Sequence, residues 1–470
     1  MRLVDLIDNV PTKWSNVEIE GIAYDSRSVK KGYIFVARQG LMHDSHNYIQ
    51  DAIRRGASAL VLERDVAVNC IPKIIVKDGR KALALLSNKF YKEPSKKLKV
   101  IGITGTNGKT TSASLIKSVY DNMGVKTGLI GTIEYWVGDK KFKAYKTTPE
   151  SSDLLELLAI MVGSGVKVAI CEVSSHALAL DRVLGIDFDI ACFTKLGRDH
   201  LDFHKTVDDY RETKLKLFKS LSKDKLAILN RDDETFDSFA KSIKARLVSY
   251  GTSPLSNVRG KLLSSSIDGN KVEISWDEQK VVVNSLLIGA HNLHNILLAF
   301  TCALSDGVPV PYIKSGIEAL ERIPGRFELI SNVIIDYAHT PDALKAALLS
   351  ARKLTKDKLI SIFGCGGERD RGKRPIMGKI ATKLSDFVII TSDNPRGENP
   401  DKIIDEIIKG VVDKNYKVIP ERSKAIEYGI RLAGKDDIVL VAGKGHEDYQ
   451  EIEGNKIPFN DRKFVQEILK

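Results

Sequence analysis

The segment KVIGITGTNGKTTSASL, residues 99–115, combines glycines, a lysine and threonines in a spacing suited to phosphate binding. Backbone N–H groups of a glycine-rich turn can point at phosphate oxygens, and the positive end of the following helix adds to the attraction. In this interpretation Gly105 and Gly108 let the backbone turn tightly. Lys109 would then reach the β- and γ-phosphates, and Thr110 would bind Mg²⁺. The segment predicts a nucleotide-binding loop.

This loop departs from the usual pattern G-x-x-x-x-G-K-[ST] by one position. The first glycine of that pattern would stand at residue 103, where the chain has Ile103, and Gly102 comes one position too early. The competing interpretation is a glycine-rich turn without a ligand, but such turns rarely carry Gly-Lys-Thr-Thr. An apolar strand-like run precedes the loop and a helical segment follows it, which is the context that a phosphate loop requires.

Candidate metal ligands follow other apolar runs. Glu172 ends one such run in CEVSSH, and His200 and Asp202 occur in GRDHLDFH. Carboxylate and imidazole groups can share Mg²⁺ with phosphate oxygens. From spacing alone, His176, His200 and His204 are equally compatible with helix caps or loops. Lys214 lies on an amphipathic helical segment, where the periodicity by itself favours a solvated lysine.

The last third of the chain carries charges of both signs in its loops. Arg396 follows an Asx–Pro turn in DNPR, and Arg369 lies in the glycine-rich GGERDRGKRP. An arginine fork binds a carboxylate through two parallel hydrogen bonds. Glu447, in GKGHE, offers the opposite charge. Together these residues would suit a zwitterion such as an amino acid, and ordinary surface charge is the competing interpretation.

Strands that alternate with helices must position these residues. Apolar runs such as VKVAICE, DIACFTKL, KLISIF and DIVLVAG each end at a polar cluster. Such alternation predicts largely parallel sheets whose carboxyl ends gather the polar clusters. We therefore expect an α/β protein of three domains: an N-terminal domain at 1–97, a central phosphate-loop ATPase domain with a parallel sheet at 98–325, and a C-terminal Rossmann-like, doubly wound domain at 326–470.

Composition narrows the function class. The chain has 470 residues, 43% hydrophobic and 28% charged, with a net charge of +11. Aromatic content is 7%, and neither a basic tail nor a nucleic-acid motif is present, so small phosphorylated ligands are favoured over nucleic acid. No transmembrane run or signal peptide is evident, and the five cysteines include no C-x-x-C pair. We expect a cytoplasmic monomer with free thiols. Cys365 could lie near chemistry, but no base is positioned beside it.

Taken together, these motifs resemble the Mur ligases, the ATP-dependent amide-forming enzymes of peptidoglycan synthesis. The family loop T-G-T-x-G-K-T-[TS] matches residues 104–111 and also lacks the early glycine. YDSRSV, TTPES, EVSSHAL, DHLDFH, GAHNLHN, DYAHTPDAL, GERDRGKRP, DNPRGENP and GKGHEDYQ extend the resemblance over nearly the whole chain. The resemblance implies a ligase that adds meso-diaminopimelate to UDP-N-acetylmuramoyl-L-Ala-D-Glu, by way of an acyl phosphate.

The resemblance also implies roles for individual residues on the nucleotide side. ATP would be bound by Gly105, Thr106, Asn107, Gly108, Lys109, Thr110, Thr111, Asn292, Asn295, Arg326 and Asp336. Mg²⁺ would be held by Thr110, Glu172, His200 and Lys214. Lys214 matches a lysine that is carbamylated in relatives, which turns a cation into an anionic ligand. Lys109, Lys214, Glu172 and His200 would be the catalytic residues.

Further roles concern the other two substrates. The UDP-sugar and the muramyl peptide would be bound by Tyr24, Ser26, Thr147, Thr148, Ser174 and Arg182. The incoming amino acid would be bound by Arg369, Asp393, Asn394, Pro395, Arg396, Gly443 and Glu447. The arginine of DNPR is associated with meso-diaminopimelate, because it can bind the distal carboxylate that lysine lacks.

The chain departs from the family pattern at a few positions, and two other functions stay open. Lys146, Leu180, Lys195, Gly197 and Glu368 stand where relatives commonly have other residues, and the first four leave details of the muramyl-peptide and metal side open. One alternative is the same reaction with L-lysine or another diamino acid. A remote alternative is a phosphate-loop nucleotide switch, which would hydrolyse ATP without an acceptor amine.

Overall fold

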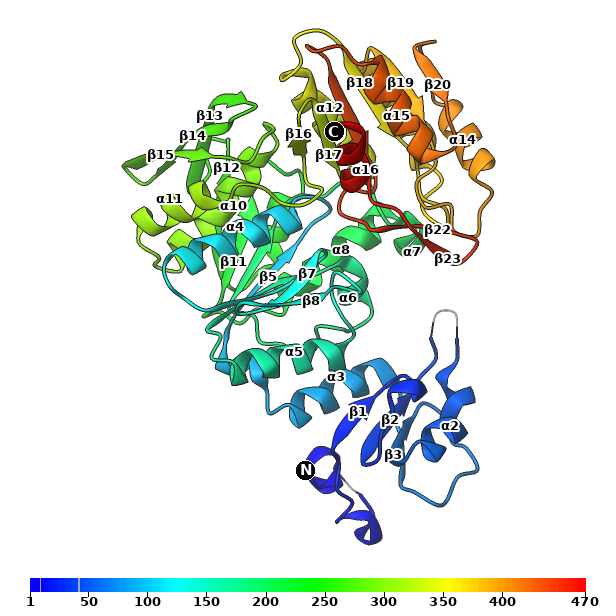
Figure 1. Ribbon diagram of the computed structural model, residues 1–470. Coiled ribbons are helices and arrows are strands. Elements are labelled where there is room, and N and C mark those ends of the chain that lie inside the picture. The colour runs from blue at the N-terminus through cyan, green and yellow to red at the C-terminus, as the bar shows by residue number, and fades with distance from the viewer. Residues whose placement is uncertain (9, 41–42) are drawn as a thin grey trace. The chain divides into compact units, whose positions relative to one another are not determined.

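A computed structural model describes residues 1–8, 10–40 and 43–470 of the chain (Figure 1). The described chain forms two compact units. The first unit comprises 1–102 and 125–190, and the second comprises 103–124 and 191–470. The domain boundaries expected from the sequence stay a prediction. In the part of the chain that the structure describes, no helix is both long enough and apolar enough to cross a bilayer.

The first unit begins with a parallel sheet in the order β1-β2-β3-β4. Successive side chains of β2 point to opposite faces, so Ile34 packs with Leu83 of α3 whereas Phe35 packs with Ala52 of α2. Helices therefore cover both faces. The strands are β1 (Gly21–Ala23), β2 (Tyr33–Ala37), β3 (Ala57–Leu62) and β4 (Lys73–Ile75), and the helices are α1 (Leu3–Leu6), α2 (Ile49–Arg54) and α3 (Gly79–Phe90). Single 3-10 turns span Thr12–Trp14, Ser26–Ser28, Ser45–Tyr48 and Pro94–Lys97.

The first unit also contains strands in the order β5-β9-β6-β7-β8. β9 and β6 are parallel, whereas β7 and β8 are antiparallel additions. Helix α5 buries Leu154, Leu158 and Met161 and contacts α3. The elements are β5 (Lys99–Thr104), which ends in the second unit, β6 (Thr127–Ile130), β7 (Glu134–Val137), β8 (Lys140–Lys143), β9 (Val168–Glu172), α5 (Ser151–Gly163) and α6 (Ser175–Ala179).

The second unit begins with the phosphate-loop helix α4 and a sheet in the order β15-β14-β13-β12-β11-β10. β11, β12 and β13 pair in parallel, and β13, β14 and β15 pair antiparallel. Helix α10 is buried almost throughout and packs on α4. The strands are β10 (Ile190–Phe193), β11 (Leu226–Asn230), β12 (Arg246–Gly251), β13 (Val258–Ser266), β14 (Gly269–Trp276) and β15 (Gln279–Ser285). The helices are α4 (Lys109–Asn122), α7 (Leu201–His204), α8 (Val207–Lys219), α9 (Phe236–Ser242), α10 (Asn292–Ser305) and α11 (Val310–Ala319).

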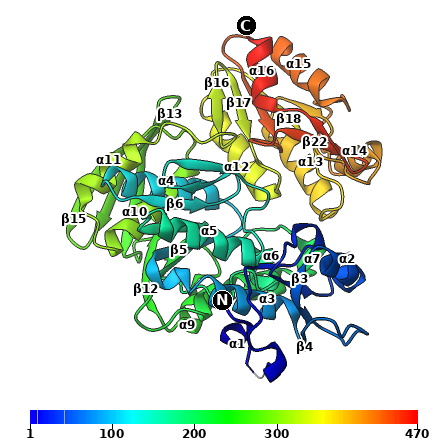
Figure 2. The same cartoon turned by 60° about the horizontal axis from the view of Figure 1, so that its bottom comes forward.

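The C-terminal part of the second unit has a sheet in the order β16-β17-β21-β18-β19-β20, parallel except for β16. Helices α12, α13 and α14 pack on one face and α15 and α16 on the other, which Figure 2 shows from a second direction. The predicted doubly wound α/β architecture is confirmed. The strands are β16 (Glu328–Ile330), β17 (Val333–Asp336), β18 (Leu359–Phe363), β19 (Phe387–Ile390), β20 (Tyr416–Val418) and β21 (Ile438–Ala442), followed by the hairpin β22 (Tyr449–Ile452) and β23 (Asn455–Pro458). The helices are α12 (Pro341–Arg352), α13 (Lys373–Leu384), α14 (Pro400–Ile408), α15 (Arg422–Leu432) and α16 (Asp461–Ile468).

Candidate active site

The loop between β5 and α4 has the backbone geometry that the sequence predicted. Gly105 and Gly108 have φ of +144° and +91°, in a region where side chains are strained. A Cβ on Gly105 would lie 1.8 Å from Thr194 Oγ1, and one on Gly108 would lie 2.5 Å from Asn295 Oδ1. Ile103 is fully buried in β5, where no glycine is needed. The expectation that these two glycines shape the loop is therefore confirmed.

Two lysine side chains donate hydrogen bonds to backbone oxygens of this loop. The ammonium of Lys109 donates to the carbonyl oxygens of Gly105 at 2.9 Å and Thr106 at 3.0 Å. Lys214, from α8, donates to the same oxygen of Gly105 at 2.8 Å. Burial, with the nearby charge of Lys109, holds the pKa of Lys214 well below its ordinary value. Lys214 is thus a buried amine biased toward its neutral form, and the solvated lysine considered from periodicity is wrong.

Residues distant in sequence meet the start of α4. Arg326 donates from Nη2 to Thr110 Oγ1 at 3.2 Å and stacks over the ring of Tyr337 at 4.3 Å. Asp336, which ends β17, accepts from the N–H of Phe327 and burial raises its pKa. The structure therefore brings the predicted Arg326 to the phosphate loop, and Asp336 binds the backbone of Phe327, the residue after Arg326.

The remaining nucleotide candidates also border this loop. Asn295 donates to Asn292 Oδ1 at 2.8 Å and accepts from Ser112 of α4 at 3.3 Å. Asn107 donates to Thr340 Oγ1 at 3.4 Å. Thr111 is buried in the first turn of α4. All of these side chains lie in the second unit, as the predicted ATP site requires.

The expected metal ligands are divided between the two units. Thr110, His200 and Lys214 belong to the second unit and Glu172 to the first. His200 has φ of +55° and its Nε2 lies 3.3 Å from Asp199 Oδ2. Glu172 is 1% exposed and accepts two hydrogen bonds at 2.9 Å from Thr132. Across the residues that the structure describes, no group of three or more His, Cys, Asp and Glu side chains is preassembled around a metal position.

In the first unit, the candidate muramyl-peptide residues converge. Thr148 donates to the carbonyl oxygen of Glu172 at 2.7 Å, and the N–H of Ser174 donates to the Thr148 hydroxyl at 3.0 Å. Arg182 donates to the carbonyl oxygen of Thr148 at 3.2 Å. The hydroxyl of Thr147 lies 3.1 Å from the hydroxyl of Thr132, which in turn donates to Glu172. Four predicted residues, two of them from the TTPES motif, therefore meet around the end of β9.

A cationic cluster surrounds Glu150, next to this group. Glu150 is 4% exposed, and its carboxylate lies 3.1 Å from Arg38, 2.9 Å from Arg182 and 3.2 Å from Lys146. Burial alone would raise the pKa of Glu150, but these cations outweigh it and lower the pKa. Nη1 of Arg38 is buried with no hydrogen-bond partner. One carboxylate among three cations leaves positive charge available for an anionic ligand, and the unusual Lys146 contributes to it.

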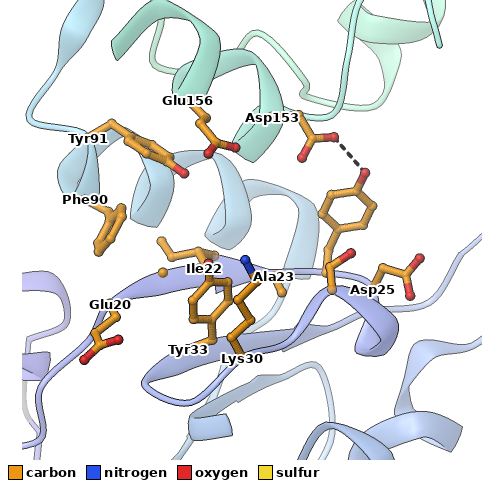
Figure 3. Close-up of a pocket in the computed structure, with 13 residues that line it drawn as sticks. Glu20, Ile22, Ala23, Asp25, Lys30, Tyr33, Phe90, Tyr91, Asp153 and Glu156 are labelled. Carbon is orange, nitrogen blue, oxygen red and sulfur yellow. Dashed lines mark hydrogen bonds between the residues drawn. The ribbon is translucent and has the colours of Figure 1, made fainter. Parts of the chain in front are cut away.

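A cavity of about 620 Å³ lies beside Tyr24 in the first unit (Figure 3). Tyr24 donates to Asp153 at 2.8 Å, and burial raises the pKa of both Asp153 and Glu156 on this wall. Ser28 lines the cavity, whereas the predicted Ser26 does not. The lining includes Glu20, Asp25, Lys30, Tyr33, Phe90, Tyr91, Asp153 and Glu156. This mostly acidic wall suits a diphosphate poorly, so the cluster around Glu150 is the better-matched surface for an anion.

The C-terminal candidates gather at the ends of β18, β19 and β21. A Cβ on Gly366 would lie 2.9 Å from Arg396 Nη1 and within 3.8 Å of Arg369 and the Asn394 carbonyl oxygen. Gly443 has φ of +117°, and a Cβ there would lie 2.6 Å from the Asp393 carboxylate. The sequence-predicted amino-acid residues therefore form one group.

Polar contacts fix this group. Asn394 donates to Glu447 at 2.8 Å, and the fully buried Lys444 donates to both Asn394 at 3.0 Å and Glu447 at 2.9 Å. Lys444 was missed from the sequence, although it lies in the GKGHE motif two residues after the alanine that ends β21. A buried lysine in this position forms an ion pair with Glu447 and fixes the orientation of its carboxylate.

Arg396 has a strained backbone that the C-terminal hairpin holds. Its φ is +53°, and its N–H donates to the carbonyl oxygen of Glu451 at 2.9 Å. Its own carbonyl oxygen accepts from Glu453 N–H at 2.7 Å, and Nη1 donates to Gly367 at 2.7 Å. Strain that surrounding contacts enforce is common at functional sites. Pro395, which precedes Arg396, is buried in the same loop.

One of the departures from the family pattern, Gly197, has a steric account. A Cβ on Gly197 would lie 2.5 Å from Asp342 Oδ2, so glycine allows that approach. The carbonyl oxygen of Lys195 accepts from Thr106 N–H at 2.8 Å, a backbone contact that any residue could make. Nothing in the structure explains Leu180. Cys365 is buried against Met377, and burial raises the pKa of its thiol to about 12, which disfavours the nucleophilic thiolate at neutral pH.

Comparisons with known proteins agree with the sequence motifs. Models of the Mur ligase family match three segments: the catalytic domain at 18–91, the Mur ligase middle domain at 103–303 and the glutamate ligase domain at 325–445. Relatives named UDP-N-acetylmuramoyl-L-alanyl-D-glutamate–2,6-diaminopimelate ligase include those of Clostridium tetani and Aquifex aeolicus, each 44% identical. The alignments cover 96% of this chain in both cases, and 95% and 94% of the relatives.

Solved structures extend the comparison. A structure of UDP-N-acetylmuramoyl-L-alanyl-D-glutamate–2,6-diaminopimelate ligase has a TM-score of 0.71 and 30% identity, covering 100% of this chain and 98% of that one. The MurF ligase of Thermotoga maritima in complex with ADP has a TM-score of 0.67 and 19% identity, covering 96% of both chains. The second likeness concerns the fold alone.

Proposed function

This chain belongs to the Mur ligase family, and we propose that it is the ligase that adds meso-diaminopimelate to UDP-N-acetylmuramoyl-L-alanyl-D-glutamate at the expense of ATP. The observation that carries the choice of amino acid is the group around Gly366, where Arg396 and Arg369 lie close to Asn394, the residue that binds Glu447. Charges of both signs in one group match a zwitterion that bears a second carboxylate.

The reaction needs ATP because a carboxylate is a poor electrophile. The γ-phosphoryl group moves from ATP to an oxygen of the peptide carboxylate, and ADP is released. The amine then attacks the acyl carbon and loses a proton, and the C–O bond to phosphate breaks as inorganic phosphate leaves. Stabilisation of the charge on the transferred phosphoryl group is the main catalytic requirement.

The phosphate loop meets this requirement. Its N–H groups and the N-terminus of α4 attract the phosphates, and Lys109, released from the carbonyl oxygens of Gly105 and Thr106, supplies a mobile positive charge. Arg326, bound to Thr110, offers a second guanidinium near the same helix start. The side chains of Asn292 and Asn295 border the loop where the rest of the nucleotide would lie.

The donor set suits Mg²⁺. The hydroxyl of Thr110 and the carboxylate of Glu172 are hard oxygen ligands, which this ion prefers, and the imidazole nitrogen of His200 would be a third protein ligand. When bound, Mg²⁺ neutralises charge on the phosphates. The buried, readily neutral Lys214 amine is the form that attacks CO₂, losing a proton to give a carbamate with two further oxygen ligands. Carbamylation of Lys214 is therefore part of this proposal.

The other substrates have separate places. Thr147, Thr148, Ser174 and Arg182 would bind the muramyl peptide, with the cationic cluster around Glu150 attracting its anionic groups. Tyr24 and Ser26 are proposed for the UDP-sugar. In the amino-acid site, Arg396 would bind the distal carboxylate and Glu447 an ammonium group. We further propose that the enzyme works as a monomer in the cytoplasm, where ATP and UDP-linked precursors are available.

One assay tests the proposal. Phosphate release is measured with ATP, Mg²⁺ and UDP-muramoyl-dipeptide while the amino acid is varied, and the product is identified by its mass. We expect turnover with meso-diaminopimelate and little with L-lysine. Turnover with lysine alone would overturn the assigned amino acid. ATP consumption that is equally fast without the dipeptide or the amine would overturn the ligase and favour a nucleotide switch.

A further inference from the structure

The carboxylate of Asp199 lies among three side chains from separate loops. Its Oδ2 is 3.3 Å from Nε2 of His200 and 3.4 Å from Nε2 of His339, and its Oδ1 is 3.7 Å from Nζ of Lys373. Asp199 is 4% exposed and Lys373 is 3% exposed. A carboxylate buried to this extent is stable only when cations or N–H groups surround it, as they do here.

The three partners come from the carboxyl ends of different strands. His200 and Asp199 follow β10, His339 follows β17, and Lys373 opens α13 after the loop from β18. His200 is a proposed metal ligand, and the loop that ends at Lys373 also carries Arg369 of the amino-acid site. Asp199 therefore connects a loop of the phosphate site with the loop that carries an amino-acid ligand.

The ring of His339 continues this connection. Its Nδ1 lies 2.8 Å from the carbonyl oxygen of Tyr337 while Nε2 faces Asp199, so acceptors lie at both nitrogens. The ring of Tyr337 packs edge-on against His339 at 4.6 Å and lies 5.2 Å from the ring of His446, beside Glu447. Arg326 stacks on the same Tyr337 ring. A change in the orientation of His339 would thus shift Tyr337, which contacts both Arg326 at the nucleotide site and His446 beside the amino-acid site.

We propose that Asp199 is a positioning residue that fixes the orientation of the His200 and His339 rings and so keeps the phosphate site aligned with the amino-acid pocket. This role rests on the proposed ligase function. Asp199 touches none of the three substrates in this assignment and acts through the two imidazoles and Lys373. Because a carboxylate only accepts hydrogen bonds, it selects the ring orientation in which each Nε2–H points toward it.

A neighbouring ion pair makes it possible to distinguish this positioning role from a role in which the residue only holds the two loops together. Arg198 binds Asp370 through two hydrogen bonds, of 2.8 Å and 3.3 Å, and thereby joins the same loops. Asp370 binds Arg198 in this ion pair, whereas Asp199 lies beside His200 and His339. Asp370→Asn is therefore the matched control for Asp199→Asn, since both remove one charge from the same pair of loops.

The experiment compares these two variants in the full-length protein. Misalignment of reacting groups by about 1 Å can cost about 10²-fold in rate, so we expect Asp199→Asn to lower kcat by about that factor. ATP affinity, measured by calorimetry, should change little because the loop amides and Lys109 supply the phosphate contacts. Asp370→Asn should keep most of the activity. In ¹⁵N-histidine NMR spectra, the ring-nitrogen shifts of His339 should change in Asp199→Asn but not in Asp370→Asn.

A double-mutant cycle completes the test. If Asp199 acts through His339, Asp199→Asn combined with His339→Gln should be no slower than Asp199→Asn alone, whereas independent effects would multiply. Equal losses in Asp199→Asn and Asp370→Asn, or multiplicative losses in the cycle, would overturn the proposal. Should Asp199→Asn fail to fold, an unchanged kcat in His339→Gln, whose side chain is 31% exposed, would also overturn it. Wild-type protein without ligase activity would instead refute the proposed function, and the NMR comparison would still decide whether Asp199 orients His339.

Discussion

Lys109 and Lys214 both donate to the carbonyl oxygen of Gly105, at 2.9 Å and 2.8 Å. Two ammonium groups that share one acceptor repel each other, which contributes to the lowered pKa of the buried Lys214. This repulsion can be relieved in two ways. Lys109 can move to the phosphates of ATP, or Lys214 can become a neutral amine and then a carbamate. Each of these changes prepares a different part of the proposed reaction.

Lys109→Ala should reduce ligase turnover by about 10³-fold. In the structure its ammonium donates to the carbonyl oxygens of Gly105 and Thr106. Loss of one group that stabilises the transition-state charge costs about 10²–10³-fold in kcat, and we expect a loss at the upper end because Lys109 carries a full charge. Phosphate release measures this effect, and circular dichroism checks the fold. A folded variant that retains turnover would contradict the assignment.

Lys214→Met should remove activity and carbamylation together. Native mass spectrometry of the wild type in bicarbonate should show the mass of one added CO₂, which this variant should lack. Wild-type protein kept free of CO₂ should lose activity and recover it when bicarbonate returns. Lys216→Met on the same helix is the control, because Lys216 is exposed and should have no effect on either measurement.

Gly105→Ala should disable the phosphate loop. The added Cβ would lie 1.8 Å from Thr194 Oγ1, and φ of +144° is strained for alanine by about 1–3 kcal/mol. The loop would move, so ATP affinity should fall, which calorimetry can measure. Gly124→Ala is a useful comparison: that glycine has φ of +77° but no atom within 4 Å of its Cβ position, so it should cost stability without affecting ATP binding.

Arg396→Ala should raise the KM for meso-diaminopimelate. A charge-assisted hydrogen bond contributes about 1.5–3 kcal/mol, which corresponds to about 10–10²-fold in KM. Any residual turnover of L-lysine should change little, because lysine has no distal carboxylate. Arg371→Ala is the matched control from a neighbouring loop, since Arg371 is exposed and pairs with Glu406. An unchanged KM for diaminopimelate in Arg396→Ala would show that another residue reads the second carboxylate.

Local patterns in the sequence predicted much of the fold and of the site. A tight turn between a strand and a helix needs residues that tolerate a positive φ, and Gly105 and Gly108 both have one. The polar clusters predicted at the ends of apolar runs do lie there, as Asp336 at the end of β17 and Asp393 after β19 illustrate. These features depend on a few adjacent residues, so the sequence carries them directly.

Contacts between distant segments could not be predicted in the same way. Arg38 binds Glu150 across 112 positions, and neither residue has a local pattern that names the other. The burial of Lys214 and Lys444 depends on which elements pack over them, and periodicity alone would leave Lys214 in solvent. The roles of Tyr24 and Ser26 stay predictions. Tyr24 lines the acidic cavity, which suits a diphosphate poorly, and Ser26 does not line this cavity.

Glu150→Gln should destabilise the first unit and change its pH dependence. The substitution leaves Arg38 and Arg182 without their buried anion, and breaking a buried ion pair costs about 3–5 kcal/mol. The pKa of Glu150 is lower in the folded chain than in the unfolded chain. Between its folded-state and unfolded-state pKa values, Glu150 is more protonated in the unfolded chain. The stability that Glu150 contributes is therefore present above this pH range and is lost as the pH falls through it. Urea unfolding from neutral to acidic pH should show a smaller acid loss in Glu150→Gln than in the wild type. Equal slopes in the two proteins would mean that the ion-pair cluster around Glu150 does not contribute to folding.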